Sequence, residues 1–154
     1  MDGVQIYPNI FGHISFSSLK EEMDFEYVNF FKRCVKRSCI LMEEIGPLMR
    51  EILGELNLNF GITPLSYFAN YYRNGNDYTP YHSDQYGDYK LLTVSFGCSR
   101  DFYFKHNTTK EVVKYKINHG DVVIFSEQVN KDYKHSIPKR TRLQEERISI
   151  LFFY

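Results

Sequence analysis

The spacing of apolar residues along the chain changes near residue 60. Before that point, Pro47 suits the first position of a helix, and apolar residues follow it at helical spacing: Leu48, Met49, Ile52, Leu53 and Leu56. This spacing predicts an amphipathic helix over residues 47–57. After residue 64, short β-rich runs alternate with turn residues, and they predict strands at 65–73, 90–96, 101–105, 112–117, 121–126, 133–137 and 147–154.

Two weaker signals lie in the first 60 residues. Ser18 followed by Glu21 resembles a capping box, which predicts a short helix over residues 18–24. Residues 27–42 fit neither period and are compatible with a short hairpin. We therefore expect a helical front end over residues 1–60, which packs against one sheet of the part that follows.

Many short strands at this spacing are typical of a closed or two-sheet β architecture such as a jelly roll. The chain has 154 residues, which fits one domain, and it shows neither repeats nor a linker rich in Gly, Ser or Pro. All of its aromatic residues are Tyr or Phe, 13 of each, and these residue types favour strands. The expected fold is one mainly β (α+β) domain over 1–154, with its jelly-roll core at 61–154.

Charge and cysteine content narrow the possible functions. Lys plus Arg and Asp plus Glu both number 19, so any nucleic-acid contact must come from a local basic patch. Cys34, Cys39 and Cys98 form no CxxC pair, which indicates neither a disulfide framework nor a zinc cluster. Because the sequence shows no signal-peptide pattern or long apolar run, we expect an intracellular protein of the cytoplasm or nucleus, without a membrane partner.

Three residues of the β-rich part suggest a metal site. His82 and Asp84 are two positions apart in an extended-looking segment, so both side chains point to the same side. His135 lies at the edge of another predicted strand. Two imidazoles and one carboxylate form the facial triad of non-haem Fe(II) oxygenases, which leaves positions open for a co-substrate and O₂. An HxD pair alone also occurs by chance. In the competing interpretation, His82 and Asp84 are surface loop residues and His135 is a core histidine.

Arg147 strengthens the metal interpretation. It begins the last predicted strand, 12 residues after His135. Strand alternation places four side chains on one face, namely Arg147, Ser149, Leu151 and Phe153. A buried arginine needs an anion, and a guanidinium binds a carboxylate with two hydrogen bonds, as the distal carboxylate of 2-oxoglutarate would allow. A salt bridge to Glu145, Glu146 or another surface acid is the alternative.

At this point the sequence resembles the AlkB-like oxygenases, which oxidatively dealkylate nucleic acids. The resemblance covers roughly residues 65–150, in the family's order and spacing, through the segments 70–77, 82–84, 94–102, 119–123 and 135–138 together with Arg147. It implies a double-stranded β-helix that binds Fe(II) and 2-oxoglutarate. The metal ligands carried over are His82, Asp84 and His135, and the 2-oxoglutarate contacts are Asn70, Tyr72 and Arg147.

The resemblance further implies O₂ as oxidant, and as substrate an alkylated base in single-stranded DNA or RNA, or one flipped out of a duplex. We expect a monomer. Tyr86 is a candidate for stacking on the base, with an ordinary loop tyrosine as the alternative. Lys134 and Arg140 belong to a basic group near His135 that is a candidate for phosphate contacts, with a solvated basic loop as the alternative.

The sequence departs from the family pattern at two places. Phe153 stands where the family's last strand has a second arginine, so weaker co-substrate binding or an inactive relative is compatible with the sequence. The front end, where relatives build a substrate lid, matches poorly. Two alternatives therefore stay open: an oxygenase of the same fold that acts on a protein or small molecule, and a catalytically inactive binding module.

Overall fold

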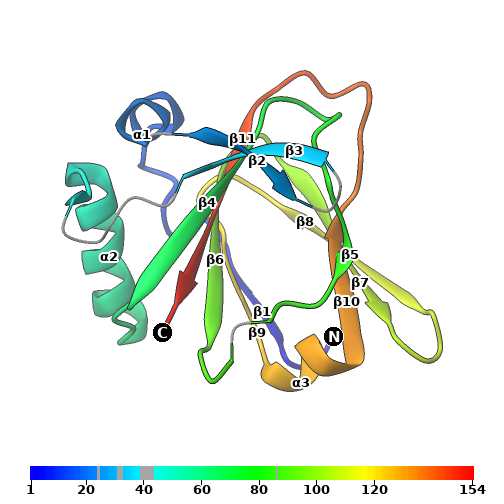
Figure 1. Cartoon of the computed structure of the whole chain (residues 1–154). Helices are drawn as coiled ribbons and strands as arrows, with labels where there is room; N and C mark the ends of the chain where they lie inside the picture. The colour runs from blue at the N-terminus through cyan, green and yellow to red at the C-terminus, as the bar shows by residue number, and fades with distance from the viewer. Residues whose placement is uncertain (24, 31–32, 39–43, 86) are drawn as a thin grey trace.

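The computed structural model describes residues 1–23, 25–30, 33–38, 44–85 and 87–154. Figure 1 shows two antiparallel sheets that face each other. The seven-stranded major sheet has the order β1 (Val4–Tyr7), β9 (Val122–Phe125), β6 (Leu91–Gly97), β11 (Arg147–Phe153), β4 (Ser66–Tyr72), β3 (Arg33–Ser38) and β2 (Glu26–Phe30). The minor sheet has the order β5 (Thr79–His82), β10 (Tyr133–Ile137), β7 (Arg100–His106) and β8 (Val112–Ile117). The predicted jelly-roll architecture is confirmed.

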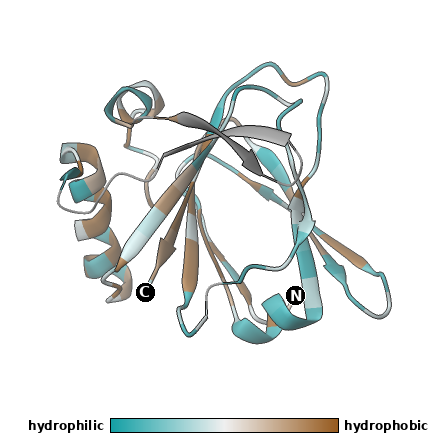
Figure 2. Cartoon of the chain, viewed as in Figure 1, coloured by the Kyte–Doolittle hydropathy of each residue, from teal (hydrophilic) through white to brown (hydrophobic). Residues whose placement is uncertain are grey.

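The predicted helices cover the outer face of the major sheet (Figure 1). They are α1 (Phe16–Glu22) and α2 (Pro47–Phe60). Their buried residues share one core with the central strands, including Leu19, Met49, Ile52, Leu56, Ile148, Ile150 and Phe152. Figure 2 shows the same pattern as hydrophobic colour along the inner side of α2 and the strands beside it. Helix α2 was predicted correctly and extends to Phe60 before Gly61 takes the left-handed conformation, with φ of 63°.

The predicted start of the first helix was wrong. Its N-cap is Ser15, whose hydroxyl accepts a hydrogen bond from the backbone N–H of Ser18 at 3.3 Å. Ser18 is therefore the third residue of α1 instead of its cap, because the cap is the residue whose oxygen receives the unpaired N–H groups of the first turn.

The front end is less helical than predicted, since it also supplies three strands. The short hairpin considered for residues 27–42 is present as β2 and β3, while residues 31–32 and 39–42 of that range lie outside the described residues. Strand β3 pairs with β4 at one edge of the major sheet. At the other edge β1, which was not predicted, pairs with β9. A third helix, α3 (Glu127–Asp132), was also missed, and it is capped by the Ser126 hydroxyl. Within the described ranges, no helix combines the length and apolarity needed to cross a membrane.

The last strand shows how the fold separates a core face from a site face. Ile148, Ile150 and Phe152 are fully buried beneath the helices. Arg147, Ser149 and Leu151 point instead into a cavity between the two sheets. In register, Arg147 lies opposite Tyr72 of β4, and Ser149 lies opposite Asn70. The alternation predicted for this strand is confirmed, and it places polar residues of neighbouring strands on one surface.

Candidate metal and co-substrate site

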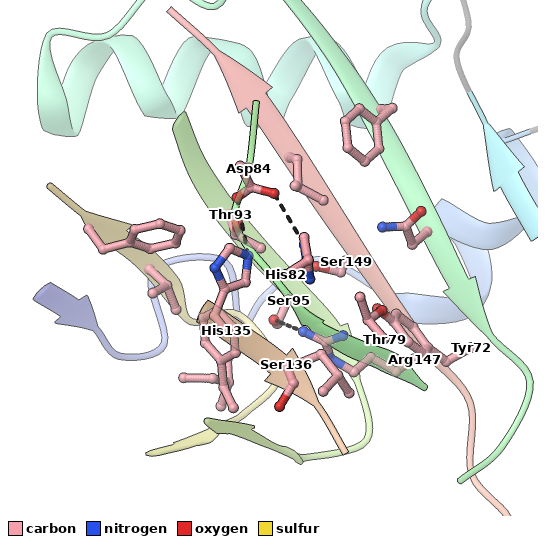
Figure 3. A pocket seen from close by; sticks show the side chains of 18 residues that line it. Tyr72, Thr79, His82, Asp84, Thr93, Ser95, His135, Ser136, Arg147 and Ser149 are labelled. Carbon is pink, nitrogen blue, oxygen red and sulfur yellow. Dashed lines mark hydrogen bonds and ion pairs between the residues drawn. The ribbon is translucent and has the colours of Figure 1, made fainter. Parts of the chain in front are cut away.

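The cavity between the sheets holds the predicted chemistry-bearing residues (Figure 3). One end is buried and surrounds Arg147, Tyr72 and Ser95. The other end is partly exposed and contains Asp84 and Leu151. We refer to these as the buried end and the open end.

The three predicted metal ligands meet at the open end. Antiparallel pairing of β5 with β10 sets His82 directly opposite His135, and Asp84 follows just beyond β5. Nε2 of His82 lies 3.2 Å from Oδ1 of Asp84, and Nε2 of His135 lies 3.2 Å from Oδ2. Their donor atoms are all within 4.8 Å of one another. Two imidazoles and a carboxylate that bind one face of a metal ion form a facial triad, and these three side chains provide that donor set.

Neighbouring groups orient these three side chains. The carbonyl oxygen of Pro80 lies 2.9 Å from Nδ1 of His82, so a proton on Nδ1 donates to it and leaves Nε2 as the metal-binding atom. The side chain of Asn130, on α3, forms two hydrogen bonds with the backbone of Asp84. Its Oδ1 accepts from the Asp84 N–H at 2.9 Å, and its Nδ2 donates to the Asp84 carbonyl at 2.8 Å. Nothing in the sequence pattern pointed to Asn130.

The electrostatics of the open end favour cation binding. Burial alone would raise the pKa of Asp84, but the imidazoles of His135 and His82 outweigh it and bring that pKa well below its ordinary value. Burial lowers the pKa of His135, which favours the neutral form of its imidazole. A carboxylate and neutral imidazoles are the protonation states that bind a metal. Oδ2 of Asp84 is buried and has no hydrogen-bond partner among the described residues, which also fits a bound cation.

The buried end contains a guanidinium without an anionic partner in the described part of the chain. Arg147 is 2% exposed, and its Nη2 donates to Oγ of Ser95 at 2.8 Å. Its Nε and Nη1 have no partner among the described residues. Glu146, one of the acids considered for a salt bridge, pairs with Lys20 at 2.6 Å instead. Burial lowers the pKa of Arg147, and a buried cation of this kind is costly until an anion reaches it.

Tyr72 and Asn70, the other predicted co-substrate contacts, line the same cavity from β4. The Tyr72 hydroxyl is 2.7 Å from Oγ1 of Thr79, and its ring lies 5.2 Å from the guanidinium of Arg147. A second buried guanidinium, Arg100, lies 5.5 Å from the same ring. Arg100 was not singled out from the sequence, although it stands in one of the matching segments. It donates to the carbonyls of Asp77 at 2.9 Å and Pro138 at 2.8 Å, which holds together two loops beside the cavity.

The open end lacks the family's second arginine. Phe153, which stands at that position, packs against Phe68 with ring centroids 5.6 Å apart. Phe68 and Leu151 line the cavity and are partly exposed. This part of the wall is therefore apolar and aromatic where the family pattern has a charge.

The predicted substrate contacts do not line the cavity. Lys134 alternates with His135 along β10, and its exposed side chain lies on the outer face of the minor sheet. Arg140 is on the same outer face, where its Nε donates to Oδ2 of Asp101 at 2.7 Å. Tyr86 lies outside the described residues.

Comparisons with known proteins agree with this geometry. The profile of the 2OG-Fe(II) oxygenase superfamily matches residues 16–152. The chain is 27% identical over 118 residues to DNA oxidative demethylase ALKBH2 of Bos taurus, which covers 69% of this chain and 42% of that protein. It is 28% identical over 119 residues to alpha-ketoglutarate-dependent dioxygenase alkB homolog 3 of Homo sapiens, with 69% and 42% covered. The chain thus spans less than half the length of these relatives.

The fold has a close counterpart among solved structures. The structure of OsALKBH1 superposes with a TM-score of 0.68 at 12% sequence identity, covering 100% of this chain and 99% of that one. At this identity the likeness concerns the fold alone. The architecture, the sequence profile and the arrangement of the cavity residues all lead to one superfamily.

Proposed function

Because the chain belongs to the 2OG-Fe(II) oxygenase superfamily and is AlkB-like, we propose that it oxidatively demethylates N-alkylated bases of DNA or RNA. Its cofactors are Fe(II) and 2-oxoglutarate. The observation that carries the proposal is a single cavity with two contrasting ends. Three candidate metal donors lie at the open end, and at the buried end Arg147 has no anionic partner among the described residues.

Each end of the cavity would have its own role. His82 and His135 would bind Fe(II) through Nε2, and Asp84 through its carboxylate. The free Nε–H and Nη1–H of Arg147 would donate to the distal carboxylate of 2-oxoglutarate, with Tyr72 and Asn70 beside it. When bound, Fe(II) with 2-oxoglutarate and O₂ supplies an oxidant for a C–H bond, while the co-substrate becomes succinate and CO₂.

A nucleic-acid base is the substrate class that the named relatives favour. Hydroxylation of an N-methyl group gives an N-hydroxymethyl group, which breaks down to formaldehyde and the unmodified base. The cavity lies between two sheets, so a base must leave its stack or come from a single strand to enter it. The partly exposed Phe68 and Leu151 present an apolar surface to a methylated base at the open end.

The test is mass spectrometry on protein loaded anaerobically with Fe(II) and then given 2-oxoglutarate, air and N-methylated oligonucleotides. Single- and double-stranded forms are compared, and both succinate and unmodified base are quantified, with His135→Ala as the blank. Demethylation that disappears in His135→Ala supports the proposal. Succinate without demethylation would retain the oxygenase and reject the nucleic-acid substrate, in favour of a protein or small molecule. The absence of both products would favour the inactive binding module, the alternative raised because Phe153 replaces the family's second arginine.

A further inference from the structure

The outer face of the minor sheet is strongly basic. Alternation along β10, β7 and β8 turns His135, Phe104 and Ile117 inward and the intervening residues outward. We define the basic face as the outward cations of these strands and the loop that follows β10: Lys105, Lys114, Lys116, Lys134 and Arg140. Lys114, Lys116 and Lys134 are exposed, and the other two are partly exposed.

Strand register brings these cations together. Lys134 lies opposite Lys105, across the pairing of β10 with β7. On the next strand, Tyr103 lies opposite Lys114, and Asp101 opposite Lys116. Lys134 and Lys105 are like charges directly opposite each other, and they repel, so this pair is unfavourable for the isolated protein. It becomes favourable when an anion lies over the face.

The chain supplies little negative charge to this face. Asp101 is the single carboxylate in the four strands of the minor sheet, and it is already bound by Arg140. Glu111 and Asp132 lie at the ends of the sheet, just before β8 and β10. Further acids lie on distant elements, such as Glu51 and Glu55 on α2, where they contact His13. A chain that is neutral overall thus concentrates cations on one surface, which indicates an anionic partner.

Aromatic rings lie between the cations. Nζ of Lys105 lies 5.5 Å from the ring of Tyr81, and Nζ of Lys114 lies 5.2 Å from the ring of Tyr103. The guanidinium of Arg140 is 5.6 Å from the same Tyr103 ring. Tyr81 is 38% exposed and lies on β5, the edge strand of the sheet. Cations that track a backbone, interleaved with rings on which bases stack, are typical of surfaces that bind single strands.

We propose that the basic face binds the phosphate backbone of a single-stranded nucleic acid next to the nucleotide that enters the cavity. This inference rests on the proposed function for the identity of the polyanion. The strands that carry His82 and His135 inward carry Tyr81 and Lys134 outward, so the face is the back of the wall that holds the metal donors. A strand with one base in the open end passes around the β5 edge onto this face.

The face continues into a surface groove beyond Lys116. Lys139, Arg140 and Arg142 line that groove together with Lys116. With the buried Arg100, five cations line this concavity, and Asp101 is its one carboxylate among the described residues. The groove therefore extends the same path for phosphates.

Binding of an unmodified, fluorescently labelled single-stranded oligonucleotide to metal-free protein tests the inference, with anisotropy measured over a range of salt concentrations. The double variant Lys114→Ala/Lys116→Ala changes exposed residues only. We expect its affinity to fall about tenfold at low salt. The slope of log affinity against log salt should decrease by about 1.4, or ~0.7 for each phosphate that the variant no longer neutralises. The charge-preserving pair Lys114→Arg/Lys116→Arg should bind like the wild type.

The matched control removes two exposed cations from other elements, with Arg50→Ala on α2 and Lys90→Ala before β6. Loss of affinity in the Lys114/Lys116 pair but not in this control supports the basic face. Equal loss in both pairs, or no loss in either, overturns it. So does a Lys114/Lys116 pair that loses binding to a polyglutamate peptide but still binds the oligonucleotide like the wild type.

The binding assay needs no metal and no modified base, so it separates this inference from the proposed function. His135→Ala should bind the oligonucleotide like the wild type. If demethylation fails while the Lys114/Lys116 pair still loses affinity, the demethylase proposal falls and the basic face stands. If demethylation is present but the pair binds normally, the basic face falls.

Discussion

The two ends of the cavity surround their buried charged side chains with different groups. At the open end the carboxylate of Asp84 lies 3.2 Å from the Nε2 atoms of His82 and His135, and hydrogen bonds with Pro80 and Asn130 hold these donor groups in place. At the buried end, Arg147 has a hydroxyl partner, and no ion pair reaches it from the described residues. The open end is therefore pre-organised without a ligand, whereas the buried end gains its main compensation only when an anion binds.

The largest expected effect comes from the open end. His135→Ala removes one of the three proposed metal donors. We therefore expect metal affinity to fall by more than about 100-fold, which exceeds the loss caused by removing a residue that only orients a metal ligand. Succinate production should be lost with it. Isothermal titration with a divalent metal and a succinate assay measure both. Retention of tight metal binding would show that His135 is a core histidine instead.

A change at Arg147 should have opposite effects on 2-oxoglutarate binding and on the stability of the ligand-free protein. Arg147→Met removes the anion partner, and we expect the KM for 2-oxoglutarate to rise roughly 100-fold or more, since truncating one member of a buried charge pair costs about 2–5 kcal/mol. The ligand-free protein should nevertheless become more stable, by about 1 kcal/mol, because an uncompensated buried cation is gone.

Thermal unfolding with and without 2-oxoglutarate checks this contrast. Wild type should gain stability from the ligand and Arg147→Met should not. A less stable ligand-free variant would mean that the buried end is compensated internally after all.

Asn130→Ala tests whether α3 positions Asp84. Loss of the two hydrogen bonds to the Asp84 backbone should lower metal affinity about tenfold, at the lower limit for groups that orient metal ligands. Gln128→Ala, on the same helix with an exposed hydrogen bond to Asp132, is the matched control and should bind metal normally. Equal behaviour of the two variants would remove Asn130 from the site.

The smallest effect concerns the aromatic pair at the open end. Phe153→Leu removes the ring that packs against Phe68, and we expect the free energy of unfolding to fall by about 1 kcal/mol. The KM for 2-oxoglutarate should stay unchanged, because Arg147 lies at the other end of the strand. Urea denaturation and steady-state kinetics measure the two quantities. A changed KM would place Phe153 in contact with the co-substrate.

Much of this site could be predicted from local pattern. Alternation in the last strand correctly assigned Arg147 to one face and Ile148 to the other. The same rule assigned Asn70 and Tyr72 to a shared face of β4. Such predictions succeed because the period of a strand is a property of the backbone itself.

Other features depended on contacts that pattern does not encode. Asn130 reaches Asp84 across 46 positions of sequence, and Arg100 is buried because two distant loops bring their carbonyls to it. Lys134 and Arg140 were predicted near the metal from their nearness to His135 in sequence. Lys134 lies on the opposite face of the sheet because neighbours along a strand point to opposite sides, and Arg140, in the loop after β10, is bound on that face by Asp101.

The sequence by itself determined the helix predicted over 47–57, most strands of the core, and the residues of each strand that share a face. It also predicted the metal donors through their resemblance to a known family. Only the tertiary structure decided that His82 lies opposite His135, that Arg147 is left without an ion pair among the described residues, and that the cations of the minor sheet form one surface. The physical reason is that the repeat of side-chain directions along a helix or strand depends on adjacent residues. Strand order and register depend on how the whole chain packs.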